Sequence, residues 1–301
     1  MKVLISGASG FIGSRIRTAL EAEGHITGAL VRRPVVNPER EVYWNPEERS
    51  IDNESMSTYD AVLHLAGKNI ADDLWTESYK TQLRSSRVDG TSLIATTMAL
   101  LGENGPQTLV SASAIGFYGD RGTELLDESS RPGQGFLPDL CREWESATLP
   151  ALEAGIRVVI PRIGIVLSRE GGFLAPLVPM FKVGLGARLG SGEQQMSWVH
   201  LRDVLRALHE LLTNEAMSGI YNVVAPNPVD NRHFTQALAT KLHRPAFLRV
   251  PEKLLKWLPG GMGKEMMLAS QRVQPTKLLD AGFRFRSPDI ESALAACFRS
   301  N

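Results

Sequence analysis

Three glycines near the start of the chain, Gly7, Gly10 and Gly13, have the spacing of a turn that binds phosphate groups. They come after an apolar strand pattern at residues 3–5 and before apolar residues at helical spacing, which is the context this motif requires. Glycine permits the tight turn, the approach of the backbone to a diphosphate and close packing of helix on strand. Free amide groups at the helix N-terminus attract the phosphate charge. A strand-to-helix turn without a ligand is the alternative. The cofactor-binding residues predicted here are Gly7, Gly10, Phe11, Ile12 and Gly13.

The residues after the second predicted strand select the type of dinucleotide. A carboxylate about twenty residues beyond the glycines would bind the adenosine ribose of NAD. The sequence has Arg32 and Arg33 there instead, and no acid beside them. Because a guanidinium can hold a 2′-phosphate through two charge-assisted hydrogen bonds, we predict NADP(H), with Arg32 as the contact. A solvated pair of surface arginines is the alternative.

The elements that position these residues alternate between strand and helix patterns. Strands are expected at residues 3–5, 25–31, 60–65, 108–111, 157–161 and 219–224. Helices are expected at 76–101, with a weak point at Gly90, and at 137–155. A strand at 198–200 is expected to enter a helix capped by Asp203. This alternation predicts an α/β fold with a doubly wound parallel sheet and helices on both faces.

A second, smaller lobe is expected from the change in composition after Gly164. Residues 171–192 hold six glycines and two prolines, and prolines and short helix patterns follow residue 226. We expect a dinucleotide-binding domain made of residues 1–166 and 196–225. The smaller C-terminal lobe would comprise residues 167–195 and 226–301.

Composition excludes several classes of protein. The 301 residues carry 33 basic and 33 acidic side chains, and this zero net charge argues against a nucleic acid or an anionic membrane as partner. Two cysteines, Cys141 and Cys297, favour a reducing compartment, and we expect a cytoplasmic protein. None of the six histidines lies in a metal-ligand motif. The expected partner is a small-molecule substrate, and a homo-oligomer is left open.

Further segments in the same order along the chain resemble the extended short-chain dehydrogenase/reductase superfamily. The resemblance is carried by HLAG at 64–67, SAS at 111–113, FYG at 117–119, PRIGIV at 161–166 and WVHLRDV at 198–204. Additional segments, ADDLW at 71–75, GLG at 184–186, GSG at 190–192 and HRPA at 243–246, are similar to its atypical epimerase-family proteins. In those NAD-dependent epimerase/dehydratase-like proteins, a small C-terminal domain of unknown function follows the epimerase-like domain. The resemblance implies cofactor contacts from Leu65, Ala66, Gly67 and Val166.

The proton-transfer pair of that superfamily, Tyr-x-x-x-Lys on a helix, is missing. None of the five tyrosines is followed four residues later by lysine. Alignment on Glu145 puts Leu137 at the tyrosine position and Cys141 at the lysine position. General acid–base assistance contributes roughly 10²–10⁴-fold in rate, so another group would have to replace the pair.

Four residues are candidates for roles near the substrate. Ser113 matches the superfamily's hydroxyl residue beside the substrate carbonyl, or it satisfies backbone groups at a strand end. Tyr118 is a candidate phenolic acid, with packing as the alternative. Arg87 stands where the superfamily has an asparagine near the cofactor, and it is predicted as a cofactor-binding residue. It would contact the ribose, the diphosphate or an anionic substrate, with a surface salt bridge as the alternative. Cys141 on an apolar helix is interpreted as a small buried hydrophobe, with a reactive thiol as the alternative.

These observations predict an NADP(H)-binding protein of the epimerase family. The expected function is oxidoreduction or epimerase-like chemistry on a small polar metabolite, with catalytic residues Ser113 and Tyr118. A non-catalytic NADP(H)-binding sensor or regulatory protein is the alternative, because the Tyr-x-x-x-Lys pair is absent.

Overall fold

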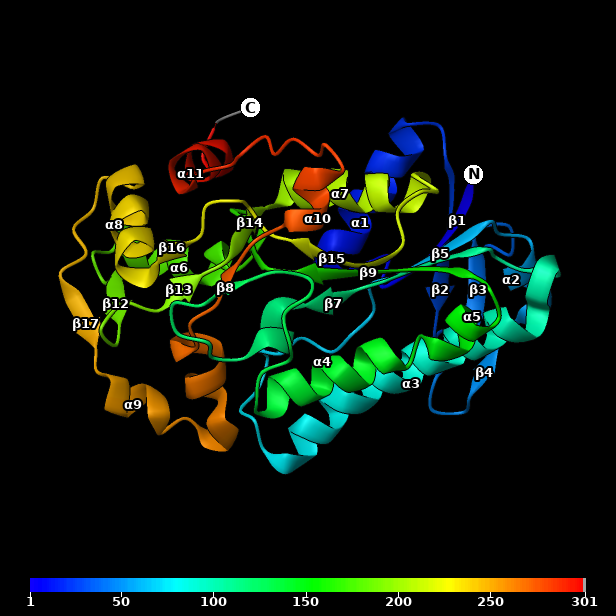
Figure 1. The fold of residues 1–301 in the computed structure, drawn as a ribbon, viewed down its shortest axis with the longest axis horizontal. Helices are drawn as coiled ribbons and strands as arrows, with labels where there is room; N and C mark the ends of the chain where they lie inside the picture. Colours follow the sequence, from blue (N-terminus) through cyan, green and yellow to red (C-terminus); the bar gives the residue numbers. More distant parts are fainter. Residues whose placement is uncertain (300–301) are drawn as a thin grey trace.

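The central element of the fold is a nine-stranded sheet, seen in a computed structural model that describes residues 1–299 (Figure 1). Its order is β15-β9-β6-β5-β1-β2-β3-β4, with β7 also paired to β9. The pairs are parallel except for β3 with β4. The strands are β1 (Lys2–Ser6), β2 (Ile26–Val31), β3 (Glu41–Asn45), β4 (Ser50–Ile51), β5 (Ala61–His64), β6 (Thr108–Ser111), β7 (Ser113–Ala114), β9 (Arg157–Ile163) and β15 (Gly219–Val223). The predicted doubly wound α/β fold is confirmed.

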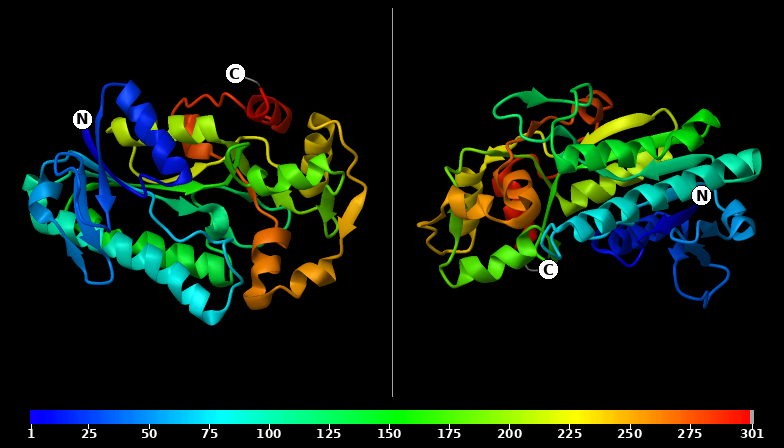
Figure 2. Two further views of the ribbon diagram at one scale, coloured as in Figure 1. Left: turned by 180° about the vertical axis from the view of Figure 1, so that it is seen from behind. Right: turned by 90° about the horizontal axis from the view of Figure 1, so that it is seen from below.

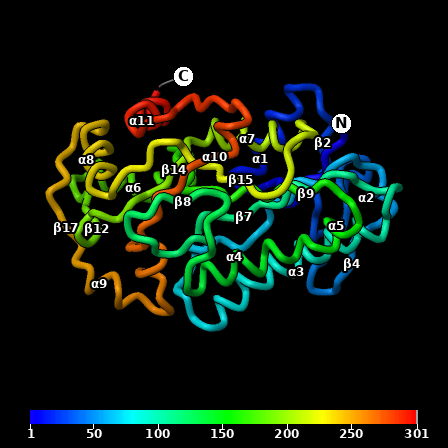
Figure 3. Tube along the Cα trace, viewed as in Figure 1, coloured from blue at the N-terminus to red at the C-terminus, as the bar shows by residue number. Residues whose placement is uncertain are grey.

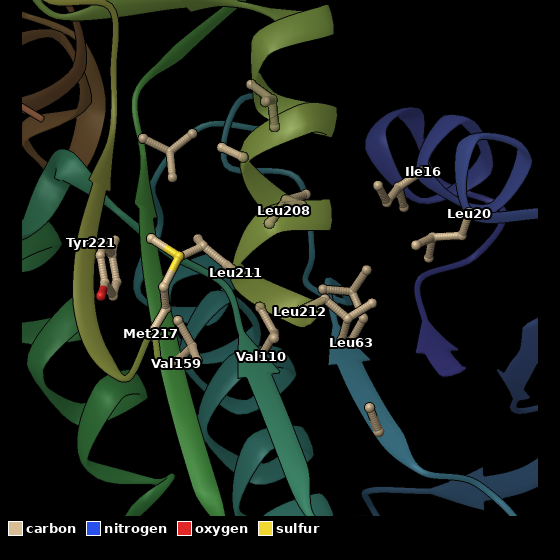
Figure 4. Packing of buried hydrophobic residues seen from close by; sticks show 14 of the residues in the cluster. Ile16, Leu20, Leu63, Val110, Val159, Leu208, Leu211, Leu212, Met217 and Tyr221 are labelled. Atoms are coloured by element: carbon tan, nitrogen blue, oxygen red, sulfur yellow. The ribbon is translucent and has the colours of Figure 1, made fainter. Parts of the chain in front are cut away.

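Helices cover both faces of this sheet because alternate strand residues point to opposite sides. On one face α1 (Phe11–Ala22) and α7 (Leu201–Thr213) pack on Val3, Ile5 and Leu63, and Figure 4 shows Ile16 and Leu208 over these strands. On the other face α3 (Glu77–Leu101) and α5 (Leu149–Glu153) cover the strands together with α2 (Asn53–Ser57). Helix α4 (Phe136–Ser146) lies beside α3 (Figure 1).

The second part of the chain forms a smaller lobe at one end of the sheet (Figure 2). Its core surrounds Trp198, Phe234 and Leu294. Its helices are α6 (Leu174–Lys182), α8 (Asn231–Lys241), α9 (Glu252–Lys256) and α11 (Ile290–Cys297). Its small sheets join β10 (Ile165–Ser168) to β11 (Gly171–Gly172) and β14 (Trp198–His200), β12 (Ala187–Leu189) to β17 (Leu248–Val250), and β13 (Gln195–Met196) to β16 (Val229–Asp230).

The chain passes between sheet and lobe several times (Figure 3). It returns to the main sheet at β15, which pairs with β9, before α10 (Thr276–Asp280) packs against β15. A further pair joins β18 (Arg272–Val273) to β8 (Leu125–Leu126), so the C-terminal segment contacts an earlier loop. The domain boundaries given above stay a prediction.

Two local predictions were wrong. The helix expected at 137–155 is divided into α4 and α5, and Pro150, which cannot donate a helix hydrogen bond, lies at the start of α5. Helix α7 is capped by His200, whose Nδ1 accepts from the Arg202 N–H at 3.2 Å. Asp203 is instead buried inside α7, and its carboxylate accepts from the main-chain N–H groups of Arg286 and Ser287.

Helix α3 has no break at Gly90. A Cβ at this position would lie 3.3 Å from the Trp44 ring, so the glycine allows close packing of the helix on β3 rather than a kink. Strands β3 and β4 were not predicted; β4 has only two residues and lies at the edge of the sheet, and β3 joins it to β2.

Membrane-spanning helices and metal-binding clusters are both absent from residues 1–299. No helix in this range combines the length and the apolar character needed to span a bilayer. No group of three or more His, Cys, Asp or Glu side chains in this range could hold a metal ion. Cys141 and Cys297 are free and buried. The cytoplasmic location and the oligomeric state stay predictions.

Candidate functional site

The glycine turn joins β1 to α1 in a conformation that leaves no room for a side chain at positions 7 and 13. Gly7 has a φ of +67°, and a Cβ there would lie 3.0 Å from the backbone of Leu65 and Ala66. A Cβ on Gly13 would lie 2.0 Å from the carbonyl oxygen of Gly7. The Gly10 N–H donates to that same oxygen at 2.9 Å. These contacts explain the glycines at positions 7 and 13 by backbone packing alone.

The N-terminus of α1 is open to an anion. Gly10 is the cap residue, no side chain caps the helix, and no acidic residue lies in its first turn. The amide groups of that first turn therefore lack a partner within the helix. Together with the helix dipole, they make a suitable site for a diphosphate, so the residues present fit the predicted dinucleotide.

A cavity of about 890 Å³ extends from this turn in two directions. One part of the cavity, where the adenosine of the cofactor is predicted to lie, is lined by Val31 and Arg32. Another part is lined by Lys68 and Ser86. We call it the glycine-turn cavity. Its predicted lining residues are Gly7, Gly10, Arg32, Leu65, Ala66 and Gly67.

Five predicted cofactor residues do not line this cavity: Phe11, Ile12, Gly13, Arg87 and Val166. The Phe11 ring packs against the β10–β11 turn, where a Cβ on Gly171 would lie 2.3 Å from it. Ile12 packs against the core, and Val166 uses its carbonyl oxygen to accept from the Phe173 N–H at 3.1 Å. Phe11 and Ile12 can therefore contact a ligand through their main-chain N–H groups, which lie at the N-terminus of α1.

The two arginines after β2 differ in their partners. Arg33 forms a two-pronged ion pair with Glu41 and donates to the Pro34 carbonyl oxygen at 2.9 Å. This guanidinium and the nearby main-chain N–H groups lower the pKa of Glu41 to about 2, so Glu41 is ionised and its charge is balanced by Arg33. Arg32 lines the cavity, and within residues 1–299 its guanidinium has no hydrogen-bond or ion-pair partner. Arg32 is therefore the arginine free to meet a phosphate.

The ends of β1 and β5 are fixed to each other by a buried histidine. His64 Nδ1 lies 2.6 Å from Ser6 Oγ, and Ser6 Oγ accepts from the N–H groups of Leu65 and Ala66 at 3.0 and 3.1 Å. Burial lowers the pKa of His64 to about 4, so the imidazole is neutral near neutral pH. This arrangement sets the path of residues 65–67 along the cavity.

Ser113 belongs to a chain of charged and polar groups at the start of β7. Its hydroxyl donates to Glu145 Oε1 at 2.6 Å, and Arg162 donates to both oxygens of Glu145 at 2.8 and 2.7 Å. The Arg162 guanidinium lies 3.3 Å from the centroid of the Phe117 ring and is 2 % exposed. Ser113 is itself buried, at 3 % exposure.

Tyr118 lies in the core rather than on a cavity surface. Its hydroxyl is 2.7 Å from Asn222 Oδ1, 2.9 Å from the Asp127 carbonyl oxygen and 3.0 Å from Arg162 Nη1. The side chain is fully buried, and burial raises the pKa of the phenol. In this structure Tyr118 holds Arg162 in place and offers no exposed proton to a substrate.

Helix α4 presents no group that ionises near neutral pH at the two positions of the missing pair. Leu137 is apolar, and burial raises the pKa of the Cys141 thiol to about 12, so it stays protonated. A residue that sequence reasoning missed lies at the start of this helix. Glu265, from the C-terminal segment, accepts from the N–H groups of Phe136 and Leu137 at 3.1 and 2.8 Å. No local pattern connects residues so far apart in the sequence.

Arg87 projects from α3 toward the end of β5. Its Nη1 donates to the Leu83 carbonyl oxygen at 3.2 Å, and its guanidinium lies 5.2 Å from the centroid of the Trp144 ring on α4. A Cβ on Gly67 would be 3.5 Å from Arg87 Cζ. The surface salt bridge that was the alternative does not form within residues 1–299, and burial lowers the pKa of Arg87.

The doubly wound sheet and the glycine turn at its first strand define a Rossmann-type protein of the short-chain dehydrogenase/reductase class. Residues 3–224 match the NAD dependent epimerase/dehydratase family, and residues 250–297 match a domain of unknown function. The chain belongs to this epimerase/dehydratase family, as the resemblance predicted.

Relatives and solved structures match this chain over 97–99 % of its length. Epimerase family protein ML0860 of Mycobacterium leprae is 41 % identical, over 97 % of this chain and 94 % of the relative. Human epimerase family protein SDR39U1 is 32 % identical over 98 % of each chain. A crystal structure of human SDR39U1 (isoform 2) with NADPH superimposes with a TM-score of 0.88 at 28 % identity, covering 99 % of each chain. A nucleoside-diphosphate sugar epimerase from Corynebacterium glutamicum gives a TM-score of 0.81 at 33 % identity, covering 98 % of this chain and 57 % of that one.

Proposed function

We propose that this protein binds NADP(H) and uses it for oxidoreduction or epimerase-like chemistry on a small polar metabolite. The observation that carries the proposal is the glycine-turn cavity, which joins an uncapped helix N-terminus to an arginine without a partner within residues 1–299. A diphosphate fits the helix N-terminus, and a 2′-phosphate fits the arginine. The NADPH in the crystal structure of human SDR39U1 supports the same cofactor.

A bound nicotinamide would supply or accept the hydride, and this chain's residues would position the substrate. Ser113 is the proposed substrate contact. Its single proton is directed to Glu145, so its oxygen is left to accept a further hydrogen bond. A substrate hydroxyl can donate to Ser113 in this state, whereas a substrate carbonyl requires the serine to release Glu145. Tyr118 supports this group through Arg162, without contacting the substrate.

A non-catalytic sensor of NADP(H) is the second candidate. The observation that favours it is helix α4, where Leu137 and the protonated Cys141 thiol offer no acid–base group. Both candidate functions use the same cofactor site, but only an enzyme would turn over a substrate.

Two measurements test the proposal. Calorimetric titration with NADPH and NADH shows whether the cavity binds a dinucleotide, and binding of NADPH is the expected result. Incubation of the NADPH-loaded protein with a panel of carbonyl metabolites, followed by nicotinamide absorbance, shows turnover. Loss of absorbance with one class of compound supports the enzyme, and tight binding without turnover on any panel member supports the sensor.

A further inference from the structure

A separate cavity, of about 700 Å³, lies in the smaller lobe and is lined by Arg188 of β12, by residues of α8 and by residues 243–248. We call it the lobe cavity. It shares no lining residue with the glycine-turn cavity. Figure 1 shows α8, β12 and β17 at the end of the molecule opposite to β1 and β2. The function proposed above therefore makes no use of the lobe cavity.

The lining of the lobe cavity is basic and holds no acidic residue. Its basic side chains are Arg188, Arg232, His243 and Arg244. Arg188 is only partly exposed, and its guanidinium forms no hydrogen bond or ion pair within residues 1–299. Arg232 has a long, exposed ion pair with Glu193, at 3.5 Å. Because the protein leaves most of the repulsion among these guanidinium groups uncompensated, an anion in the cavity would be stabilised.

Two of the arginines come together over a glycine. Gly192 has a φ of +76°, and a Cβ there would lie 2.4 Å from Arg188 Cδ and 3.2 Å from Arg232 Cβ. Both side chains therefore enter the lobe cavity from the same part of its wall, within reach of one bound anion. Each guanidinium can hold two oxygens of a phosphate through charge-assisted hydrogen bonds.

A buried hydroxyl in the same lining has no partner. Thr235 on α8 is 4 % exposed, and its hydroxyl forms no hydrogen bond within residues 1–299. This oxygen is not among the polar atoms that are fully sealed from solvent, so the lobe cavity gives access to it. Leaving a buried hydroxyl unpaired costs free energy, and an oxygen of a ligand would remove that cost.

The rest of the wall is apolar. His243, directly after the C-cap of α8, has a φ of +53°, a conformation that favours glycine, and it turns the chain so that residues 244–248 line the cavity. Within that segment Phe247 is 91 % exposed. An exposed aromatic ring beside arginines suits a ligand in which a flat apolar group is attached to an anion.

We propose that the lobe cavity is a binding site for a small organic phosphate. Arg188, Arg232 and the Thr235 hydroxyl hold the phosphate, and the Phe247 ring packs on a flat apolar group of the same molecule. This site is additional to the cofactor site and does not depend on the proposed function.

Calorimetric titration of the purified full chain with phenyl phosphate, inorganic phosphate and phenol tests the proposal. Phenyl phosphate carries both recognised groups, whereas each of the other two probes carries one. Saturable binding of phenyl phosphate is expected, with phenol at least about tenfold weaker and inorganic phosphate about two- to tenfold weaker. No binding of phenyl phosphate, or equal binding of phenol, overturns the proposal. Equal binding of inorganic phosphate overturns the role of Phe247.

Variants locate the bound phosphate. Arg188→Met should weaken phenyl phosphate at least about tenfold. Phe247→Ala, at an exposed position that does not support the core, should lower its affinity to that of inorganic phosphate. Lys241→Met removes a charge from α8 outside the lining and is the matched control, with no change expected. If Arg188→Met binds phenyl phosphate as the unaltered chain does, the phosphate lies elsewhere and the proposal is wrong.

Titration with NADPH reports on the glycine-turn cavity separately. NADPH affinity should be unchanged in Arg188→Met and Phe247→Ala, because neither residue lines that cavity. Loss of NADPH affinity in these variants would show that the two cavities do not act as separate sites. If the unaltered chain binds phenyl phosphate but no NADPH, the proposed function fails and the lobe site stands.

Discussion

The Ser113 hydroxyl donates to Glu145 Oε1 at 2.6 Å, and both oxygens of that carboxylate are held by Arg162. The serine is thereby fixed in one orientation at the start of β7, with its proton directed to Glu145. Glu145 comes from the helix on which the superfamily carries its Tyr-x-x-x-Lys pair. In this chain that helix contributes a carboxylate that orients Ser113, in place of a phenol.

Replacement of Glu145 should destabilise the fold strongly. In Glu145→Gln the nearly buried Arg162 keeps its charge without a partner, which costs about 3–5 kcal/mol of the free energy of unfolding. Urea denaturation measures this change. Glu143→Gln on the same helix removes only an exposed pair with Arg84 and should cost less than about 1 kcal/mol. Equal losses of unfolding free energy in Glu145→Gln and Glu143→Gln would contradict a special stabilising role of the buried Glu145–Arg162 pair.

Replacement of Ser113 should separate chemistry from folding. In Ser113→Ala, Glu145 keeps its two contacts with Arg162, so the fold should lose only about 1 kcal/mol. NADPH affinity should stay unchanged, because Ser113 does not line the glycine-turn cavity. Turnover on any substrate found in the absorbance assay should be lost. Full turnover in a well-folded variant would remove Ser113 from the proposed site.

The choice between NADPH and NADH should depend on Arg32. Arg32→Ala removes the guanidinium that has no other partner within residues 1–299, and the preference for NADPH should fall by about ten- to a hundredfold. Competition titrations with the two dinucleotides measure the ratio. Arg33→Lys is the control, since it keeps a positive charge beside Glu41, and should leave the ratio unchanged. A larger effect from Arg33→Lys than from Arg32→Ala would assign the phosphate to Arg33.

Stability at acidic pH should depend on His64. Burial lowers the pKa of His64 to about 4 in the folded chain, below its ordinary value near 6.5. Between these values the unfolded chain binds a proton that the folded chain excludes, so the free energy of unfolding should fall as pH drops from about 6.5 to about 4. The contribution is about 3 kcal/mol. Urea denaturation across this range should show a shallower pH dependence for His64→Gln, and identical slopes would contradict the assignment.

Local patterns predicted much of the fold and the cofactor half of the site. The glycine turn is encoded in seven successive residues, 7–13, and the strand-helix alternation on either side of it fixes its position at the carboxyl end of β1, in the middle of the sheet. Arg32 could be named because it follows β2 directly. The division of α4 from α5 could also have been read from Pro150.

The other half of the site depends on contacts between distant residues. Glu145 meets Ser113 across 32 positions, and Glu265 reaches Leu137 across 128 positions. No spacing in the sequence reports such pairs, because they are set by how the helices and the C-terminal segment dock. The burial of Tyr118 has the same origin, since its hydroxyl is covered by Asn222 from β15.

Calorimetric titration of the purified chain with NADPH and with NADH tests the central claim most directly. The structure predicts saturable binding of NADPH, with a lower Kd than for NADH. The open N-terminus of α1 can bind the diphosphate, and Arg32 can bind the 2′-phosphate that NADH lacks. Absence of heat with both dinucleotides would contradict the assignment of the glycine-turn cavity as a cofactor site.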